Sequence, residues 1–329
     1  MATYTLVKLK NMTPLHIGTG QENYDFSASD LRSDTLSAAL AALQAQQGKG
    51  EDVRQFLESF AISSAFPFVG DRYFLPKPQG KVNIEVSDAE EYPSRKKLKK
   101  LRFIEQGLWK ELIAGRKLIV KEAQLKDKFL LSDSEANDFD KPYLSQVNQR
   151  VTVPREEGKD ADPFFFEWIY FRENAGLFCL LDAPEKLREE ILDLFERLSE
   201  AGLGTDRNVG GGKFEVEAVP FSLPEIADAN AMMLLSLFIP TEEDIKRLDL
   251  ENARYELVRR GGFIAGSEEV DFRHLRKKSI YMFNTGSIFK TTQRPTGKVV
   301  DLRPDWNDER LHPVFRSGKP FVVPIKTME

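Results

Sequence analysis

The chain has a single cysteine, Cys179, which stands between apolar neighbours. One cysteine excludes a disulfide scaffold and leaves almost no room for a zinc–thiolate cluster. The N-terminus lacks the basic segment and following apolar segment of a signal peptide. The longest mainly apolar run, Met232 to Ile239, is about half as long as a membrane span requires. We therefore expect a cytoplasmic protein from a reducing compartment, with no membrane partner.

The chain also has no overall excess of positive charge. The chain carries 47 Lys and Arg residues against 52 Asp and Glu residues, a formal net charge of −5. This balance argues against wrapping of nucleic acid over the whole surface, although a local basic stripe can still bind it. The length of 329 residues predicts two domains. The 24 Phe residues favour packed sheets over a helical bundle.

Hydrophobic periodicity predicts an α+β chain. The elements expected in the first part are a strand over Thr3–Lys10, a helix N-capped by Ser33-Asp34, an edge strand and extended segment over Ala65–Pro78, an amphipathic helix over Ser94–Lys117, an irregular stretch over Leu118–Lys141, a hairpin arm over Tyr143–Pro154, paired strands over Phe164–Phe171 and Gly176–Leu181, and a helix over Pro184–Ala201. A strand over Phe214–Val219, a linker over Pro220–Asn230 and a second αβ unit from Ala231 onward, ending in a strand over Pro320–Ile325, complete the pattern. The first half fits a ferredoxin-like (RRM-type) sheet with helices on one face.

A glycine-rich segment between the helix and the strand that follows it is the most informative feature. It runs from Gly202 to Lys213 and contains Gly204, Arg207, Asn208, Gly210, Gly211 and Gly212. Glycines let a backbone approach a ligand closely, and exposed amides beside Arg207 and Lys213 would suit a phosphate. The segment runs from helix to strand, so it is not a Walker A loop. A long turn that only stops the helix at Gly202 is an equally good interpretation.

Three cationic segments are further candidates for RNA contact. The run Ser94–Arg102 includes Lys96 and Lys97, and the predicted hairpin Tyr143–Arg155 includes Arg150. Arg260 belongs to Arg259-Arg260-Gly261-Gly262-Phe263. Cationic faces bind RNA by counterion release, and apolar hairpin tips can wedge against bases. Solvated helix faces and ordinary surface hairpins remain the alternatives.

His16 follows the first strand and precedes Gly18 and its loop. An imidazole with an ordinary pKa near 6.5 could act as a general acid–base. The sequence points to no nucleophile or second acid–base group, and His274 and His312 show no recognised metal-ligand spacing with it. A structural or RNA-contacting role for His16 is the preferred interpretation, and no metal site is expected.

Several of these segments occur in the same order in a known family. They are Leu15-His16-Ile17-Gly18, Ser33-Asp34-Thr35-Leu36, Tyr73-Phe74-Leu75-Pro76-Lys77-Pro78, the Lys96–Phe103 run, the segment Gly202–Phe214, Arg260-Gly261-Gly262-Phe263, Gly286-Ser287-Ile288-Phe289, and His312-Pro313-Val314 with Gly318-Lys319-Pro320-Phe321. Together they resemble the fourth subunit of the Csm effector complex of type III-A CRISPR systems, a group of the RAMP superfamily. The glycine-rich segment alone would indicate only the superfamily. Fewer cations stand in it than in some relatives.

The resemblance implies two ferredoxin-like (RRM/RAMP) domains, residues 1–220 with a thumb region inserted at about 80–160, and residues 221–329. It implies a non-catalytic RNA-binding subunit in antiviral defence, without a cofactor. Its expected partners are the 5′ tag of the crRNA, the large polymerase-domain subunit, the adjacent backbone RAMP subunit and target RNA near the 5′ end of the guide. We predict that the amides of Gly210, Gly211 and Gly212 hold phosphates with Arg207 and Lys213, close to His16.

Three alternatives remain open. The first is a crRNA-processing endoribonuclease of the same superfamily that uses His16. The second is a scaffold whose basic patches meet acidic protein surfaces. The third is a different RAMP subunit of the same complex, at the opposite end of the filament. The segment Leu75-Pro76-Lys77-Pro78 argues against the third.

Overall fold

The computed structural model describes residues 2–18, 24–88, 91–133, 139–154, 160–264, 267 and 269–327. Arg155, at the tip of the predicted hairpin, lies outside these residues. Among the helices of the described residues, none is both long and apolar enough to cross a bilayer.

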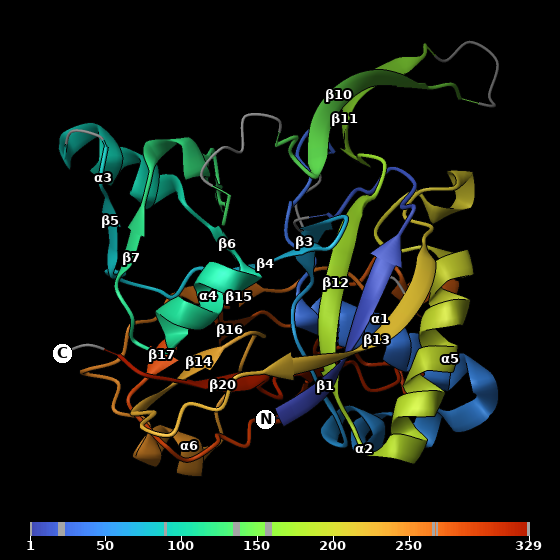
Figure 1. The fold of residues 1–329 in the computed structure, drawn as a ribbon. Helices are drawn as coiled ribbons and strands as arrows, with labels where there is room; N and C mark the ends of the chain where they lie inside the picture. The colour runs from blue at the N-terminus through green and yellow to red at the C-terminus, as the bar shows by residue number, and fades with distance from the viewer. Residues whose placement is uncertain are drawn as a thin grey trace.

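A nine-stranded sheet organises the N-terminal part of the chain (Figure 1). Its strand order is β13 (Glu215–Leu223), β1 (Ala2–Lys10), β12 (Ala175–Asp182), β3 (Phe66–Val69), β4 (Arg72–Pro76), β6 (Phe103–Glu105), β9 (Phe129–Leu130) and β8 (Leu125–Lys126), with β2 (Ala61–Ile62) paired to β12. The predicted first strand and the strand after the glycine-rich segment are therefore confirmed. The strand after the glycine-rich segment, β13, continues to Leu223, so the start of the predicted linker Pro220–Asn230 belongs to the sheet.

The first strand has apolar cores on both of its faces. Tyr4 and Leu6 pack in one core, whereas Val7 and Leu9 pack in another. Alternate residues of a strand point to opposite faces. Burial on both faces explains why the apolar pattern of Thr3–Lys10 does not alternate cleanly.

Three helices cover the second of these cores. They are α1 (Ser33–Gln44), α2 (Val53–Glu58) and α5 (Glu185–Ala201), seen together on one side of the sheet in Figure 1. The helices predicted after Ser33 and over Pro184–Ala201 are confirmed. The predicted N-cap is wrong, because Arg32 occupies that position and makes no side-chain cap bond. Asp34 instead lies in the first turn, where its carboxylate binds other partners.

Two segments of the first half differ from the sequence prediction. The stretch Ala65–Pro78 forms the hairpin β3–β4 inside the sheet, not an edge strand. Pro67 fits there because β4 pairs only with Phe68 and Val69 of β3. The predicted single helix Ser94–Lys117 is divided into α3 (Glu91–Lys100), β6 and α4 (Gln106–Ile113). Phe103 and Ile104 pair with Pro76 and Leu75, so sheet pairing outweighs helix periodicity at this point.

The region expected to be irregular, Leu118–Lys141, contains short strands. They are β7 (Leu118–Val120), parallel to β5 (Ile84–Val86), and the pair β8–β9. A long hairpin then follows from β10 (Tyr143–Thr152) and β11 (Asp162–Phe171), and it projects beyond the sheet in Figure 1. The predicted hairpin arm is confirmed. Its partner was predicted wrongly, because Phe164–Phe171 pairs with β10, while β12 pairs with β1 and β3.

The C-terminal part is built mainly from short strands. It contains the sheet β17 (Ile288–Phe289), β14 (Ala231–Leu234) and β20 (Val322–Ile325), the ribbons β15 (Leu257–Arg260) with β16 (Ile280–Phe283) and β18 (Val299–Asp301) with β19 (Phe315–Ser317), and α6 (Glu242–Arg247). The predicted final strand is confirmed. Within the described residues after Leu223, α6 is the one α-helix and spans six residues. Helices therefore contribute little to the described residues of this part, for which the resemblance implied an RRM-like domain.

The two parts of the chain share a hydrophobic core. Leu6 and Phe178 of the large sheet belong to the same buried cluster as Met233 and Ile325 of the C-terminal sheet. The Tyr4 and Phe321 rings lie 4.9 Å apart between centroids. Burial of this common surface fixes the C-terminal part against the large sheet.

Candidate nucleic-acid interface

The glycine-rich segment folds back on itself directly after α5. Gly202 ends the helix at a φ of 79°. The amide of Leu203 then donates to the carbonyl of Gly212 at 2.9 Å, and the amide of Thr205 donates to the carbonyl of His16 at 3.0 Å. These bonds join the segment to the loop after β1.

The three clustered glycine amides are already hydrogen-bonded within the chain. Gly210 donates to the carbonyl of Arg207 at 3.0 Å, Gly211 to that of Asp206 at 3.2 Å, and Gly212 to that of Pro14 at 2.9 Å. The prediction that these amides hold phosphates is therefore wrong for this arrangement, because each N–H has a protein acceptor.

Close packing explains several of these glycines instead. A Cβ on Gly204 would lie 2.2 Å from the carbonyl oxygen of His16, and one on Gly212 would lie 1.9 Å from that of Leu203. A Cβ on Gly211 would lie 2.8 Å from the Trp168 ring. Glycine is required wherever a backbone is approached this closely. Gly210 differs, since its Cβ position is open and only its φ of 89° favours glycine.

The outer tip of the segment presents polar and cationic groups to solvent. Arg207 and Asn208 lie in a short 3-10 turn, Lys213 precedes β13, and all three are exposed, as is Gly204. Within the described residues the side chains of Arg207, Asn208 and Lys213 make no hydrogen bond or ion pair. Contact of these two cations with a phosphate stays a prediction.

Arg150 joins the long hairpin to this segment. Its guanidinium forms an ion pair with Asp206 and lies 4.3 Å from the centroid of the Phe166 ring and 5.2 Å from that of Trp168. Cation–π contacts of this kind stabilise a guanidinium over a ring face. Arg150 thus positions the hairpin over the glycine-rich segment, and its charge is already compensated.

His16 is placed beside the segment, but it is buried. Its side chain lies under the Phe166 ring, with centroids 4.4 Å apart, and the residue is only 1% exposed. Nδ1 lies 2.8 Å from the carbonyl oxygen of Glu167 and must donate to it. Nε2 and the Oγ1 of Thr205 are buried without a partner among the described residues. Gly18 is exposed next to Thr205. A buried ring of this kind does not reach an RNA strand at the surface.

Aromatic residues that sequence reasoning missed extend this surface. The Tyr24 ring stacks on that of Phe166, with centroids 5.8 Å apart, and lies 6.1 Å from that of Phe164. Tyr24 is 48% exposed and Phe26 is 61% exposed. We call Tyr24, Phe164, Arg207, Asn208 and Lys213 the hairpin-foot surface. The aromatic members carry no local motif, and only the fold brings them to the glycine-rich segment.

The other predicted RNA-binding residues lie elsewhere. Lys96 and Lys97 are exposed on α3, which Figure 1 shows well separated from the long hairpin, and Lys97 pairs with Glu122 at 2.8 Å. Arg260 donates to the buried carboxylate of Asp34 at 2.8 and 3.1 Å. The structure therefore does not unite these three residues with the hairpin-foot surface.

A buried charge cluster surrounds Asp34. Arg316 also pairs with this carboxylate and is itself 6% exposed. Burial lowers the pKa of the Arg316 guanidinium to about 10. Nothing in the sequence indicates this cluster, because Asp34 and Arg316 are 282 residues apart. It joins α1 to β15 and β19, so Arg260 has a structural role here.

Neither a metal site nor a reactive thiol stands out. The described residues contain no group of three His, Cys, Asp or Glu side chains placed to hold a metal ion. Cys179 is buried, and burial raises the pKa of its thiol well above the usual range.

Two family models match this chain. The model of the RAMP superfamily matches residues 8–215, and the model of the CRISPR Csm4 C-terminal domain matches residues 227–325. Among curated proteins, the CRISPR system Cms protein Csm4 of Mycobacterium tuberculosis (strain H37Rv) is 27% identical over 311 residues, 93% of each chain. The protein of the same name from Streptococcus thermophilus is 25% identical over 326 residues, 94% of this chain and 95% of the relative.

Solved structures show a similar fold. A chain of the Csm1–Csm4 cassette in complex with cA4 superposes with a TM-score of 0.62 at 22% identity, covering 100% of both chains. A chain of the Csm3–Csm4 subcomplex of a type III-A CRISPR-Cas interference complex gives 0.61 at 18% identity, covering 98% of this chain and 99% of the other. The resemblance to the fourth Csm subunit is thus confirmed by the curated relatives and the C-terminal family model, and the solved structures show that the fold is shared. The chain belongs to the RAMP superfamily, and its C-terminal part carries a Csm4 C-terminal domain.

Proposed function

We propose that this chain is a non-catalytic subunit of a type III-A CRISPR effector complex that binds the 5′ tag of the crRNA in the cytoplasm. The observation that carries the proposal is the hairpin-foot surface, where the exposed Tyr24 ring and the half-buried Phe164 ring belong to the aromatic cluster that packs on the glycine-rich segment. Arg207 and Lys213 of the same segment have no acid partner among the described residues. RNA ends are recognised in this way, because unstacked bases pack on aromatic rings while phosphates meet Arg and Lys. The relatives named Csm4, matched over almost the whole chain, supply the biological setting.

The cations of this surface would position the strand. Arg207 and Lys213 have no acid partner among the described residues and flank the close-packed glycines. The glycines then act indirectly: they let the segment pack tightly on His16 and Trp168, and this packing fixes the direction of its exposed tip. Tyr24 and Phe164 would offer ring faces to the bases of the tag.

The long hairpin would separate the guide from the first target nucleotides. One face of the hairpin packs on His16 and the glycine-rich segment. The opposite face is open to solvent and carries three exposed apolar side chains, with Gln149 between the two valines: Val147 is 50%, Val151 55% and Phe165 57% exposed. The register places Val147 opposite Glu167 and Val151 opposite Pro163, with Phe165 between them, so the three side chains share that face. An exposed apolar ridge of this kind suits a wedge against stacked bases.

The protein partners proposed are the large polymerase-domain subunit and the adjacent backbone RAMP subunit. The support is the likeness in fold to chains of a Csm1–Csm4 cassette and of a Csm3–Csm4 subcomplex. The chain resembles the Csm4-named relatives from end to end, which disfavours a RAMP subunit from the opposite end of the filament.

Nuclease activity through His16 is disfavoured by the geometry. A general acid–base must come within hydrogen-bond reach of its substrate. His16 is buried, with Nδ1 bonded to a backbone carbonyl. Incubation of the purified chain with repeat RNA in the absence of metal should leave the RNA intact. Cleavage at a single site that is lost in His16→Ala would support the endoribonuclease instead.

The tag-binding role is tested by removing the two free cations. The variant carries Arg207→Gln and Lys213→Gln, in a complex reconstituted with crRNA. The logarithm of the binding constant falls linearly with the logarithm of the salt concentration, and each phosphate contact contributes about 0.7 to the size of that slope for a single strand. Loss of both contacts should therefore reduce the slope by about 1.4. Substitution of Gly211 is a poorer test, because the new side chain would collide with Trp168.

The matched control is Arg197→Gln, which removes an exposed cation from the outer face of α5. It should leave tag affinity and its salt dependence at wild-type values. Equal crRNA retention by the wild type and the double variant over the whole salt range would contradict the proposal.

A further inference from the structure

A cavity of about 250 Å³ lies where three parts of the chain meet. Its walls come from the loop before α1, from β4 and the end of α3, and from Asn284 and Thr285 of the C-terminal part. We call it the junction pocket and define it by its four cations, Arg32, Lys77, Lys99 and Arg102. No sequence motif indicated it, because the four residues come from separate segments.

The charges in the junction pocket do not balance. Two carboxylates, Asp30 and Glu256, face the four cations. Asp30 is bound by Arg102 at 2.6 Å, and Glu256 accepts a hydrogen bond from the Asn284 amide at 2.7 Å. Both acids are thus already engaged, and positive charge remains in excess.

Lys77 and Lys99 supply most of this excess. The ammonium of Lys77 lies 3.4 Å from the carbonyl oxygen of Leu98 and has no carboxylate partner among the described residues. Burial lowers the pKa of Lys77, as expected for an ammonium withdrawn from water without a counter-ion. Lys99 makes no hydrogen bond or ion pair within the described part of the chain, and its side chain is exposed at the rim. A bound anion would supply the counter-charge that Lys77 lacks among the described residues.

The pocket also has an apolar wall. Phe66, Leu101 and Phe103 line it and are almost fully buried. The hydroxyls of Ser64 and Thr285 lie 3.2 Å apart in the wall near the C-terminal part. A cavity with an apolar wall, hydroxyls and a cationic rim suits a phosphate together with its sugar. Its volume is below the roughly 300–1,000 Å³ of pockets that enclose a drug-sized ligand, so it suits a piece of a strand better than a whole cofactor.

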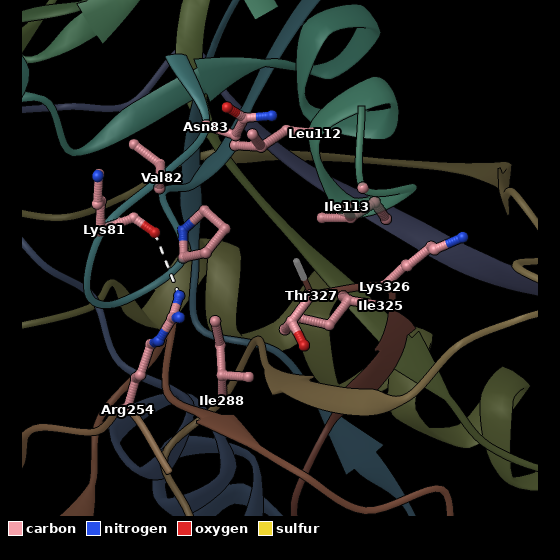
Figure 2. Close-up of a pocket in the computed structure, with 12 residues that line it drawn as sticks. Lys81, Val82, Asn83, Leu112, Ile113, Arg254, Ile288, Ile325, Lys326 and Thr327 are labelled. Carbon is pink, nitrogen blue, oxygen red and sulfur yellow. Dashed lines mark hydrogen bonds between the residues drawn. The ribbon is translucent and has the colours of Figure 1, made fainter. Parts of the chain in front are cut away.

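A second cavity of similar size provides the contrast. Figure 2 shows this space of about 220 Å³, lined by Leu112, Ile113, Ile288 and Ile325 among others. Its Arg254 donates to the carbonyl of Lys81 at 3.2 Å, the dashed line in Figure 2, and its Lys326 pairs with Asp228. Its lining is mainly apolar and two of its three cations are engaged, which leaves Lys81 alone without a side-chain partner among the described residues. It therefore holds less free positive charge than the junction pocket.

We propose that the junction pocket binds one phosphodiester group of the guide RNA, a second contact point distinct from the hairpin-foot surface. This inference rests on the proposed function for the identity of the RNA, and on the junction pocket alone for the place of binding. A strand held at both places would cross from the hairpin foot to the C-terminal part.

The test uses the full chain and a fluorescent single-stranded oligoribonucleotide that contains the 5′ tag. The variant carries Lys77→Gln and Lys99→Gln, and the control carries Lys186→Gln and Lys246→Gln, two exposed lysines on α5 and α6. Anisotropy titrations across salt concentrations should give a log–log slope lower by about 1.4 for the variant and unchanged for the control. An unchanged slope in the variant would overturn the proposal, while the tag-binding role would stand if the wild type binds.

Acetylation of the wild-type chain gives an independent readout that does not depend on the folding of a variant. RNA should protect Lys77 and Lys99 from acetylation and leave Lys246 reactive. The same titration is repeated with inorganic phosphate and with AMP. If either compound protects both lysines to the same extent as the oligonucleotide, the pocket binds a free phosphate compound instead of RNA. Protection by an acidic peptide but not by RNA would assign it to a protein partner. A wild type that binds no RNA would remove the proposed function and this inference together.

Discussion

Asp34 carries the most consequential buried charge in the described structure. Its side chain is 0% exposed and pairs with both Arg260 and Arg316. Removal of one partner from a buried ionic cluster leaves the others uncompensated in a low-dielectric region. Sequence reasoning assigned this aspartate to a helix cap and Arg260 to RNA, because pairing between distant residues leaves no local pattern.

Asp34→Asn should therefore lower the free energy of unfolding by about 3–5 kcal/mol. Urea unfolding followed by circular dichroism measures the change. Asp305→Asn is the control, since its pair with Lys278 is at the surface and the Asp305 side chain is 92% exposed. A variant as stable as the control would show that the cluster contributes little.

Asp244 gives the fold a pH dependence. Burial acts to raise the pKa of this carboxyl, but hydrogen bonds from the amides of Thr241, Thr296 and Gly297 outweigh burial and hold the pKa below its usual value. A carboxyl with a lower pKa in the folded state stabilises the fold above its unfolded pKa of about 3.9. This contribution is lost as the pH falls through the folded pKa.

The variant Asp244→Asn should accordingly be less stable than wild type at pH 7. It should also lose less further stability than wild type as the pH falls from about 5 to about 2. Urea midpoints measured at intervals of pH provide both comparisons. Parallel pH profiles for the two proteins would rule out a role for this carboxyl in acid sensitivity.

At the scale of elements, the glycine-rich segment acts as a packed connection between α5 and β13. Its position between a helix and a strand followed from the sequence, since α5 and β13 each show clear periodicity. The hydrogen-bond partners of its glycine amides could not be predicted from the sequence. The acceptors are the carbonyl of Pro14 and carbonyls within the segment's own turn. Composition reveals where a backbone can bend, but tertiary contacts decide which amides remain free.

Two alanine substitutions separate packing from backbone conformation in this segment. The Cβ of Gly210→Ala would enter open space. This variant should lose only about 1–2 kcal/mol of unfolding free energy, the cost of a left-handed conformation for a residue with a side chain. Gly212→Ala places Cβ against the carbonyl of Leu203 and should destabilise the chain by clearly more. Thermal unfolding of both variants makes the comparison. Equal losses would indicate that the segment yields easily.

The long hairpin is the other element whose role can be isolated. Phe165 is 57% exposed on its free face, so Phe165→Ala should leave the unfolding midpoint nearly unchanged. If bases stack there, affinity for single-stranded RNA should fall by about 1–3 kcal/mol. Tyr281→Ala removes an equally exposed ring from β16 and serves as control. Equal RNA affinities of the two variants would argue against the wedge.

Across the whole molecule, the shared core determines where binding surfaces can form. The strand periodicity of the first half predicted β1, β12 and β13 of the large sheet but not β6, β8 or β9, whose few residues pair only in the folded chain. The family resemblance is confirmed over nearly the full length. The C-terminal part was harder to predict, because its strands are two to four residues long and alternate with turns. The junction pocket exists only because Asn284 and Thr285 are held against β4 and the loop before α1.

The most direct measurement is a crosslinking map of the guide RNA in the assembled complex. Photoreactive 4-thiouridine is placed at one position of the crRNA at a time, and the crosslinked peptides of this chain are identified. Nucleotides of the 5′ tag should crosslink to residues 204–213 or to β10 and β11. Crosslinks only from the 3′ end of the guide, or none to this chain from the tag, would contradict the account.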